Sequence, residues 1–401
     1  MIRRTLLSAT ALATLALAGC ASGAATAPSA SPASAPDAGH GAVDGAQEMS
    51  EPQSRVLSVS AEGEVGLVDL LSGEESALGQ VGAPAGVASD GRFAFVTTAD
   101  GVDIVDGGAW TWDHGDHFHY YLAEPRVVGS LPGDGAAHVT TPPLSSAGTT
   151  GVFFAGSGEA VALDMTALDD GEISERFRVS TGATSGVVAP VGDGALVAVA
   201  DGPGADTATL YDASGAAGET VACADPTGAV TTRVGTAVAC ADGALIVTGG
   251  GADAAIERVA LPDGGALASD FAGRKNRPTV AALADDGGVW LLDTRAAAWT
   301  HVDVDAELGR VVAADDAAGH LVAVDAAGAV RVFDEAGKAL GSTDPLVEDP
   351  AGATLTVDTE RAYLTAPGAG LVYEIDYADG ARIAREVATP TAPDAAIEVG
   401  R

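Results

Sequence analysis

The chain has 401 residues, with 56 acidic residues against 20 basic ones and a formal net charge of −36. A surface this acidic repels nucleic acid and anionic lipid, so the composition argues against a nucleic-acid-binding protein. It concentrates cations near itself, but solubility or adaptation to salt explains the same charge, so composition alone does not establish metal binding.

The chain begins with the features of a secretion signal. Two arginines precede a short apolar run over 6–17, which is too short to span a membrane and is typical of a signal peptide. Leu17-Ala-Gly-Cys20 follows and matches a bacterial lipobox, in which processing acylates the cysteine. We therefore expect a lipoprotein signal peptide over 1–19 and an extracytoplasmic protein that Cys20 anchors to the outer face of the cell membrane. An ordinary signal peptide with a chance cysteine is the alternative.

Residues 20–52 consist mainly of Ala, Ser, Pro and Gly with scattered acids. They lack the aromatic and branched apolar residues whose burial would offset the entropy lost on ordering. We expect a flexible tether after the lipidated cysteine. His40 is its only histidine and is interpreted as a solvated side chain.

From residue 53 onward, short runs of alternating apolar residues are separated by Asp-Gly, Gly-Gly and Asp-Ala turns. One unit recurs: a turn, a strand rich in Val, Leu and Ile, and often an aspartate at its end. The copies lie at 64–69, 101–106, 159–164, 207–212, 288–293, 329–334 and 371–376, with a degenerate copy at 255–261. About eight units with a period of roughly forty residues predict an all-β fold, a β-propeller of seven or eight four-stranded blades. The count favours eight blades in a single domain over 53–401, whereas two β-sandwich domains would not maintain the period.

The longest gap between copies contains the most unusual stretch of the chain, Asp113-His-Gly-Asp-His-Phe-His-Tyr-Tyr121. Three of the seven histidines fall within six residues here, beside carboxylates. Imidazole and carboxylate are ligands that suit Zn²⁺ and its neighbours in the first transition row. Because loops on a rigid scaffold carry binding groups, we expect a metal-binding insertion in the second blade at about 107–126.

Within this insertion the spacing of the histidines predicts how they share an ion. If the segment is extended, His117 and His119 lie on the same face and can bind one metal. Gly115 permits a reversal of the chain that brings His114 or Asp116 to the same ion.

The remaining histidines differ in their expected roles. The repeat position of His138 predicts the start of the innermost strand of the next blade, facing the central axis, where it would supply a further ligand. The alternative is a hydrogen bond from His138 to the backbone of a turn. His301 is interpreted as a solvated residue of an outer strand, and His320 as a structural residue.

With Cys20 lipidated, only Cys223 and Cys240 remain. An even pair in an oxidising compartment favours a disulfide, and neither cysteine has the close spacing of a metal site. The sequence has no Gly-x-Ser-x-Gly elbow, no phosphate-binding glycine loop ahead of a helix and no HExxH motif, so it offers little support for catalysis.

The segment Trp110-Thr-Trp-Asp-His-Gly-Asp-His-Phe-His-Tyr-Tyr121, followed by Ala123-Glu-Pro-Arg126, resembles the metal-binding segment of the AztD-type zinc metallochaperones. Those are extracytoplasmic β-propellers that pass zinc to the solute-binding protein of a zinc ABC transporter. The resemblance implies Zn²⁺ as the metal and that solute-binding protein as the partner of a monomer without catalytic turnover. The ligands that it implies are His114, Asp116, His117 and His119, with His138 from the next blade.

Two other functions remain open at this stage. A metal-dependent hydrolase or lactonase would use the same ligands around a bound water, and it would need a general base and a pocket beside His117. An interaction scaffold would use the histidines structurally. Zinc transfer is chemically coherent because coordination without thiolates suits a compartment in which cysteine ligands would be lost to disulfides.

Overall fold

The computed structural model describes residues 41–401 except 114, 116 and 351. The predicted signal peptide, Cys20 and His40 lie outside the described residues, and so do His114 and Asp116.

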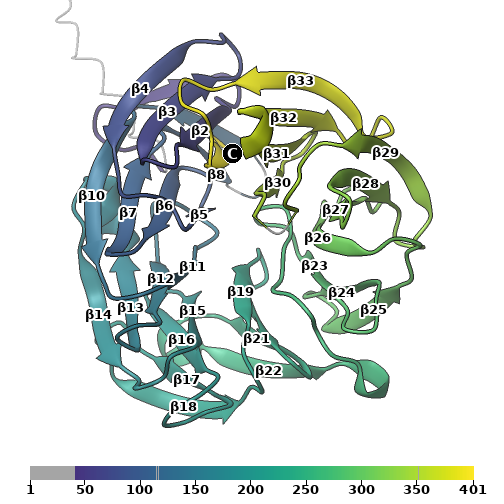
Figure 1. Ribbon diagram of the computed structural model, residues 1–401. Coiled ribbons are helices and arrows are strands. Elements are labelled where there is room, and N and C mark those ends of the chain that lie inside the picture. Colours follow the sequence, from purple (N-terminus) through teal and green to yellow (C-terminus); the bar gives the residue numbers. More distant parts are fainter. Residues whose placement is uncertain (1–40, 114, 116, 351) are drawn as a thin grey trace, which may run out of the picture. The chain divides into compact units, whose positions relative to one another are not determined.

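Eight antiparallel sheets follow one another around a ring, with the first strand of most blades nearest the centre (Figure 1). Blade 1 comprises β34 (Ala395–Val399), β2 (Arg55–Val59), β3 (Glu64–Asp69) and β4 (Glu75–Gln80). Blade 2 comprises β5 (Gly86–Ser89), β6 (Phe93–Thr98), β7 (Gly101–Asp106) and β10 (Arg126–Pro132). Blade 3 comprises β11 (Ala137–Thr140), β12 (Thr149–Phe154), β13 (Glu159–Asp164) and β14 (Glu175–Ser180). Blade 4 comprises β15 (Gly186–Val191), β16 (Gly194–Val199), β17 (Thr207–Tyr211) and β18 (Ala217–Ala222).

The second half of the ring repeats this plan. Blade 5 comprises β19 (Gly228–Thr231), β20 (Thr236–Cys240), β21 (Gly243–Thr248) and β22 (Ala255–Ala260). Blade 6 has only β23 (Thr279–Leu283), β24 (Val289–Asp293) and β25 (Ala298–Val302). Blade 7 comprises β26 (Leu308–Ala313), β27 (Leu321–Asp325), β28 (Ala329–Phe333) and β29 (Ala339–Pro345). Blade 8 comprises β30 (Leu355–Val357), β31 (Ala362–Ala366), β32 (Leu371–Asp376) and β33 (Arg382–Ala388).

The ring closes because β34, at the end of the chain, pairs with β2 near its start. The predicted all-β propeller is confirmed, and the number of blades is eight. Short helices occur only between strands in the described residues: α1 (Met165–Asp169), η1 (Gly251–Asp253), η2 (Pro262–Gly264) and η3 (Pro367–Ala369). Across the same residues, no helix has the length and apolar character needed to cross a membrane.

Burial along each blade explains its sequence pattern. The middle strands β6 and β16 are buried along their whole length, and they consist of small and apolar residues because a neighbouring blade covers each face. The outermost strand β18 is almost entirely exposed and, unlike the middle strands, includes a charged residue, Glu219. The core therefore lies between blades, as where Leu57 and Val59 of blade 1 pack with Ala94 and Val96 of blade 2. The predicted disulfide between Cys223 and Cys240 is also present and buried.

Blade 6 departs from the plan. Its innermost position is taken by an irregular segment that bridges the blade only at Leu267↔Ala284 and Ala272↔Ala281, and then joins blade 7 through Gly273↔Ala313. This segment leads into the loop 274–277, which contacts Arg233 of blade 5, Asp315 after β26 and Arg401 at the end of the chain. The repeat pattern of the sequence does not predict this irregularity.

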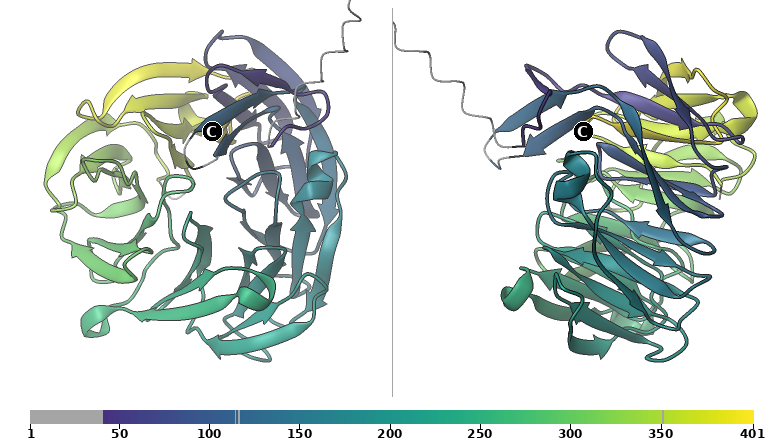
Figure 2. Two further views of the ribbon diagram at one scale, coloured as in Figure 1. Left: turned by 180° about the vertical axis from the view of Figure 1, so that it is seen from behind. Right: turned by 90° about the vertical axis from the view of Figure 1, so that its left-hand side faces the viewer.

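Between β7 and β10 the chain forms a hairpin of β8 (Ala109–Asp113) and β9 (Phe118–Leu122), which falls within the predicted insertion. Figure 2 shows this hairpin on the face opposite to that of Figure 1. A third strand, β1 (Gln47–Met49), pairs with β9. The predicted flexible tether over 20–52 therefore extends too far, because the unpaired edge of the hairpin binds a strand from within that range.

Candidate metal centre

His117 and His119 lie side by side on the hairpin, as their spacing predicts. Their Nε2 atoms are 3.0 Å apart, and the ring centroids are separated by 4.9 Å. Two nitrogens bound to one tetrahedral zinc at 2.0–2.1 Å would be about 3.3 Å apart. The distance between the two Nε2 atoms is therefore close to the spacing of two ligands on one zinc ion.

Glu48 of β1 orients His119. Its Oε1 atom lies 2.6 Å from Nδ1 of His119, which places the imidazole proton on Nδ1 and leaves the lone pair of Nε2 facing His117. A carboxylate on the far nitrogen of a ligating histidine fixes the ring orientation and raises the basicity of the ligating nitrogen. No sequence pattern predicts this role for Glu48, which is 71 positions from His119 and falls within the predicted tether.

Aromatic packing holds the base of the hairpin against the propeller. Tyr121 stacks on Trp110 with centroids 5.3 Å apart, and both side chains are buried. The guanidinium of Arg92 lies 4.0 Å from the centroid of Trp110. Arg92 is itself fixed by a bidentate contact with Asp106 and by Nη1, which donates to Asp169 at 2.6 Å. The hairpin thus has a rigid base beneath its histidines.

His138 lies on an innermost strand, β11, as predicted, but the structure pairs it with Asp270 of blade 6 rather than with a described residue of the hairpin. Its Nε2 is 3.6 Å from Oδ2 of Asp270, and its Nδ1 is buried without a hydrogen-bond partner. Asp270 fits there because residue 228 is glycine, whose added Cβ would come within 1.9 Å of the carboxyl carbon. The predicted hydrogen bond to a turn backbone is not observed.

The inner segment of blade 6 contacts both the hairpin and His138. Asp270 lies beside His138, and six residues further along, Nδ2 of Asn276 donates to Oδ2 of Asp113 at 3.2 Å. Six extended residues span at most about 20 Å. The hairpin tip and the His138 pair are therefore contacted by one short stretch of chain.

Two other histidines have structural surroundings. His320 is buried and pairs through Nδ1 with Asp316 at 2.6 Å, in keeping with its predicted role. His301 is not simply solvated, since it packs on Trp290 and contacts Gly287 O at 3.1 Å. Within the described residues no group of three or more His, Cys, Asp and Glu side chains is arranged to hold a metal ion.

Comparison with known proteins finds solved structures with a similar fold. No family model matches the sequence, and no curated protein matches it either. Two solved structures of AztD from Citrobacter koseri, one of them of the apo protein, resemble this structure with TM-scores of 0.73 and 0.72. Each has 20% sequence identity and covers 87% of this chain and 98% of its own. The resemblance to AztD is thereby confirmed at the level of the fold.

Proposed function

We propose that this protein is an extracytoplasmic zinc-binding metallochaperone, which transfers Zn²⁺ to the solute-binding protein of a zinc ABC transporter. The observation that carries the proposal is the pair of His117 and His119, with Nε2 atoms 3.0 Å apart and Glu48 behind them. The likeness of the fold to AztD and the similarity of the hairpin segment to the AztD-type metal segment support it.

In this proposal His117 and His119 bind zinc through Nε2. The adjacent His114 and Asp116 complete the coordination from the same hairpin, and His138 provides a further donor in the channel. His117 is exposed, so the ligands of an acceptor can approach the metal and replace the histidines one at a time. Lipidation at Cys20 would keep the protein at the outer face of the membrane, near a transporter.

The hairpin lines neither of two pockets found among the described residues. A pocket of about 820 Å³ is formed by loops of blades 1, 2, 7 and 8, including residues Gly86, Val347 and Asp394. These loops join the outer strand of one blade to the inner strand of the next, or β27 to β28 and β31 to β32, whereas the hairpin joins β7 to β10 at the other end of the strands. The second pocket, lined by Gly192, Asp212 and Gly250, lies at the hairpin's end of the strands but in blades 4 and 5. A hydrolase that used the hairpin metal would need its substrate pocket beside His117.

Zinc titration of the mature protein in competition with a chromophoric chelator tests the proposal. We expect one equivalent to bind more tightly than about 1 µM, and His117→Ala or His119→Ala to weaken binding by roughly a hundredfold. His301→Ala is the matched control and should leave the affinity unchanged. Wild-type affinity weaker than micromolar, or equal affinities in all three variants, would rule the proposal out. Transfer to the solute-binding protein is then followed with a fluorescent zinc probe.

A further inference from the structure

Most of the described cations in this acidic protein are paired with a carboxylate. Of its 20 Lys and Arg residues, Arg3 and Arg4 lie outside the described residues, which leaves 18. Twelve of these 18 form an ion pair with Asp or Glu. Arg233 and Arg274 are two of the described cations that form none; Arg274 begins loop 274–277, and Arg233 contacts this loop at Asn276 O.

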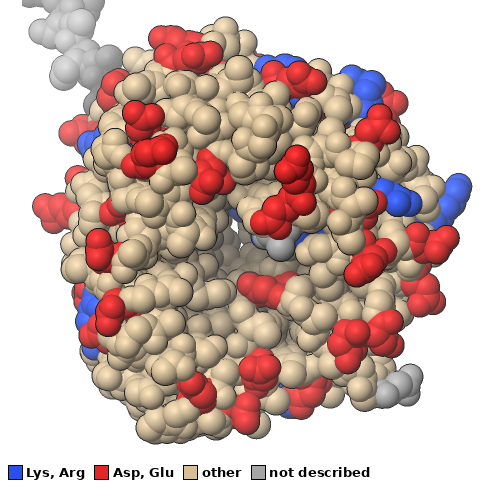
Figure 3. Space-filling view, in the orientation of Figure 1, with Lys and Arg blue, Asp and Glu red and all other residues tan. Residues whose placement is uncertain are grey.

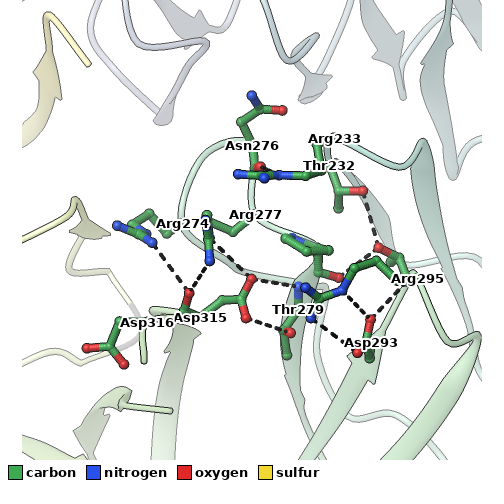
Figure 4. Close-up of polar contacts among 12 residues, drawn as sticks. Thr232, Arg233, Arg274, Asn276, Arg277, Thr279, Asp293, Arg295, Asp315 and Asp316 are labelled. Atoms are coloured by element: carbon green, nitrogen blue, oxygen red, sulfur yellow. Dashed lines mark hydrogen bonds and ion pairs between the residues drawn. The ribbon is translucent and has the colours of Figure 1, made fainter. Parts of the chain in front are cut away.

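Figure 4 shows these two arginines with the carboxylates of Asp315 and Asp316, of which Asp316 pairs with His320. Arg233 is exposed and its Nε donates only to Asn276 O, at 3.1 Å. Arg274 is half-buried, its Nη2 lies 3.4 Å from Asp315 O, and its Nε is buried without a hydrogen-bond partner. The nearby carboxylate of Asp315 is already paired with Arg277 at 3.2 Å. A half-buried guanidinium with an unused donor is a site that an anion would stabilise.

The two arginines lie at the same end of the channel as the tip of the hairpin. Asn276, which accepts the bond from Arg233, donates to Asp113 of β8. Opposite Asp113 on β9 is Phe118, which neighbours His117 and is 53% exposed. An exposed aromatic ring and unpaired cations therefore flank the candidate zinc ligand.

The face of the ring opposite to the hairpin carries carboxylates around its central opening, with Lys and Arg mainly towards the rim (Figure 3). An acidic partner would be repelled from that opening.

We propose that Phe118, Arg233 and Arg274 form the docking surface for the zinc acceptor, and that the acceptor presents a carboxylate-rich loop to them. The inference rests on the proposed function and adds the chemistry of the partner. Carboxylates satisfy the unpaired guanidinium groups, and complementary charge sets both the rate and the orientation of encounter. Acidic oxygens held beside His117 can also serve as the first incoming zinc ligands.

Binding between the full-length mature protein and the solute-binding protein, measured by biolayer interferometry without metal, tests this surface. Arg233→Glu should lower the association rate by about tenfold at low ionic strength, and Arg274→Gln should lower it less. Lys338→Glu is the matched control because Lys338 is also exposed and forms no ion pair among the described residues, but it lies on the outer loop of blade 7. The control should change the rate by less than about twofold, and added salt should reduce the wild-type rate.

The outcomes separate the two proposals. Equal association rates for wild type and Arg233→Glu, with equal zinc affinities, would overturn the docking surface and leave the metallochaperone proposal intact. Weak zinc binding by the wild type would overturn the proposed function, while association that depends on Arg233 would still support the docking surface. If the wild type instead binds phosphatidylserine vesicles and Arg233→Glu does not, the cluster belongs to a membrane contact and the proposal is wrong.

Discussion

Glu48 gives the sharpest test of the metal centre, because it is far from the histidine cluster in the sequence. Glu48→Gln keeps the length of the side chain but removes the charge that holds the proton on Nδ1 of His119, 2.6 Å away. Partners of this kind change metal affinity by roughly 10- to 100-fold. The Glu48 side chain is 54% exposed, so water screens the contact and the lower end of this range applies. We expect a tenfold loss of zinc affinity, about 1.4 kcal/mol.

The assay is a competition titration with a chromophoric zinc chelator, and the control is Glu51→Gln. Glu51 lies three positions away, just beyond β1, and is exposed like Glu48. Both variants change the net charge equally, so a general electrostatic effect would weaken both. If Glu48 orients His119, Glu48→Gln weakens zinc binding and Glu51→Gln does not. Equal affinities for Glu48→Gln and Glu51→Gln would refute the reasoning.

Detachment of β1 from the hairpin in Glu48→Gln would also lower the zinc affinity. The structure of the hairpin in this variant is therefore measured separately. Trp110 donates from Nε1 to Gly41 O at 2.9 Å, and this contact depends on the segment that leads into β1. Tryptophan fluorescence should therefore be unchanged in Glu48→Gln if only the orientation of His119 is affected. The absorption spectrum of bound Co²⁺ should shift, since it reports the geometry of the ligands directly.

Three further predictions concern stability. Replacing Cys223 and Cys240 by alanine should lower the free energy of unfolding by about 3 kcal/mol in denaturant titrations, because the bond joins residues 17 positions apart. Arg92→Met leaves Asp106 buried without its cation, and a thermal melt should show a loss of about 3 kcal/mol or more together with changed tryptophan emission. Burial lowers the pKa of Lys275 to about 8. Between pH 8 and 9 the unfolded state, in which Lys275 has its ordinary pKa, therefore binds more protons than the folded state. The free energy of unfolding should rise by about 1 kcal/mol as the pH increases over this range, and Lys275→Met should remove that rise.

Much of the fold follows from local patterns. Alternating apolar residues between glycine-rich turns predict strands, and the regular return of the unit ending at Asp69, Asp106 and Asp164 predicts the blades. A period of two also places His117 and His119 on one face, which the structure shows. The disulfide follows from there being two cysteines outside the predicted lipobox of a chain that begins like a secreted protein.

The tertiary structure alone decides which distant groups meet. Glu48 reaches His119 because β1 adds to the edge of the hairpin, and Asp270 reaches His138 because residue 228 has no side chain. Arg233 and Arg274 gather beside the hairpin because the irregular inner segment of blade 6 crosses the end of the channel. The physical reason is that a strand's periodicity depends on its own residues, whereas these contacts depend on how eight blades close into a ring. The pairing of His117 with His119 could therefore be predicted from the sequence, whereas the groups that orient and surround these histidines could not.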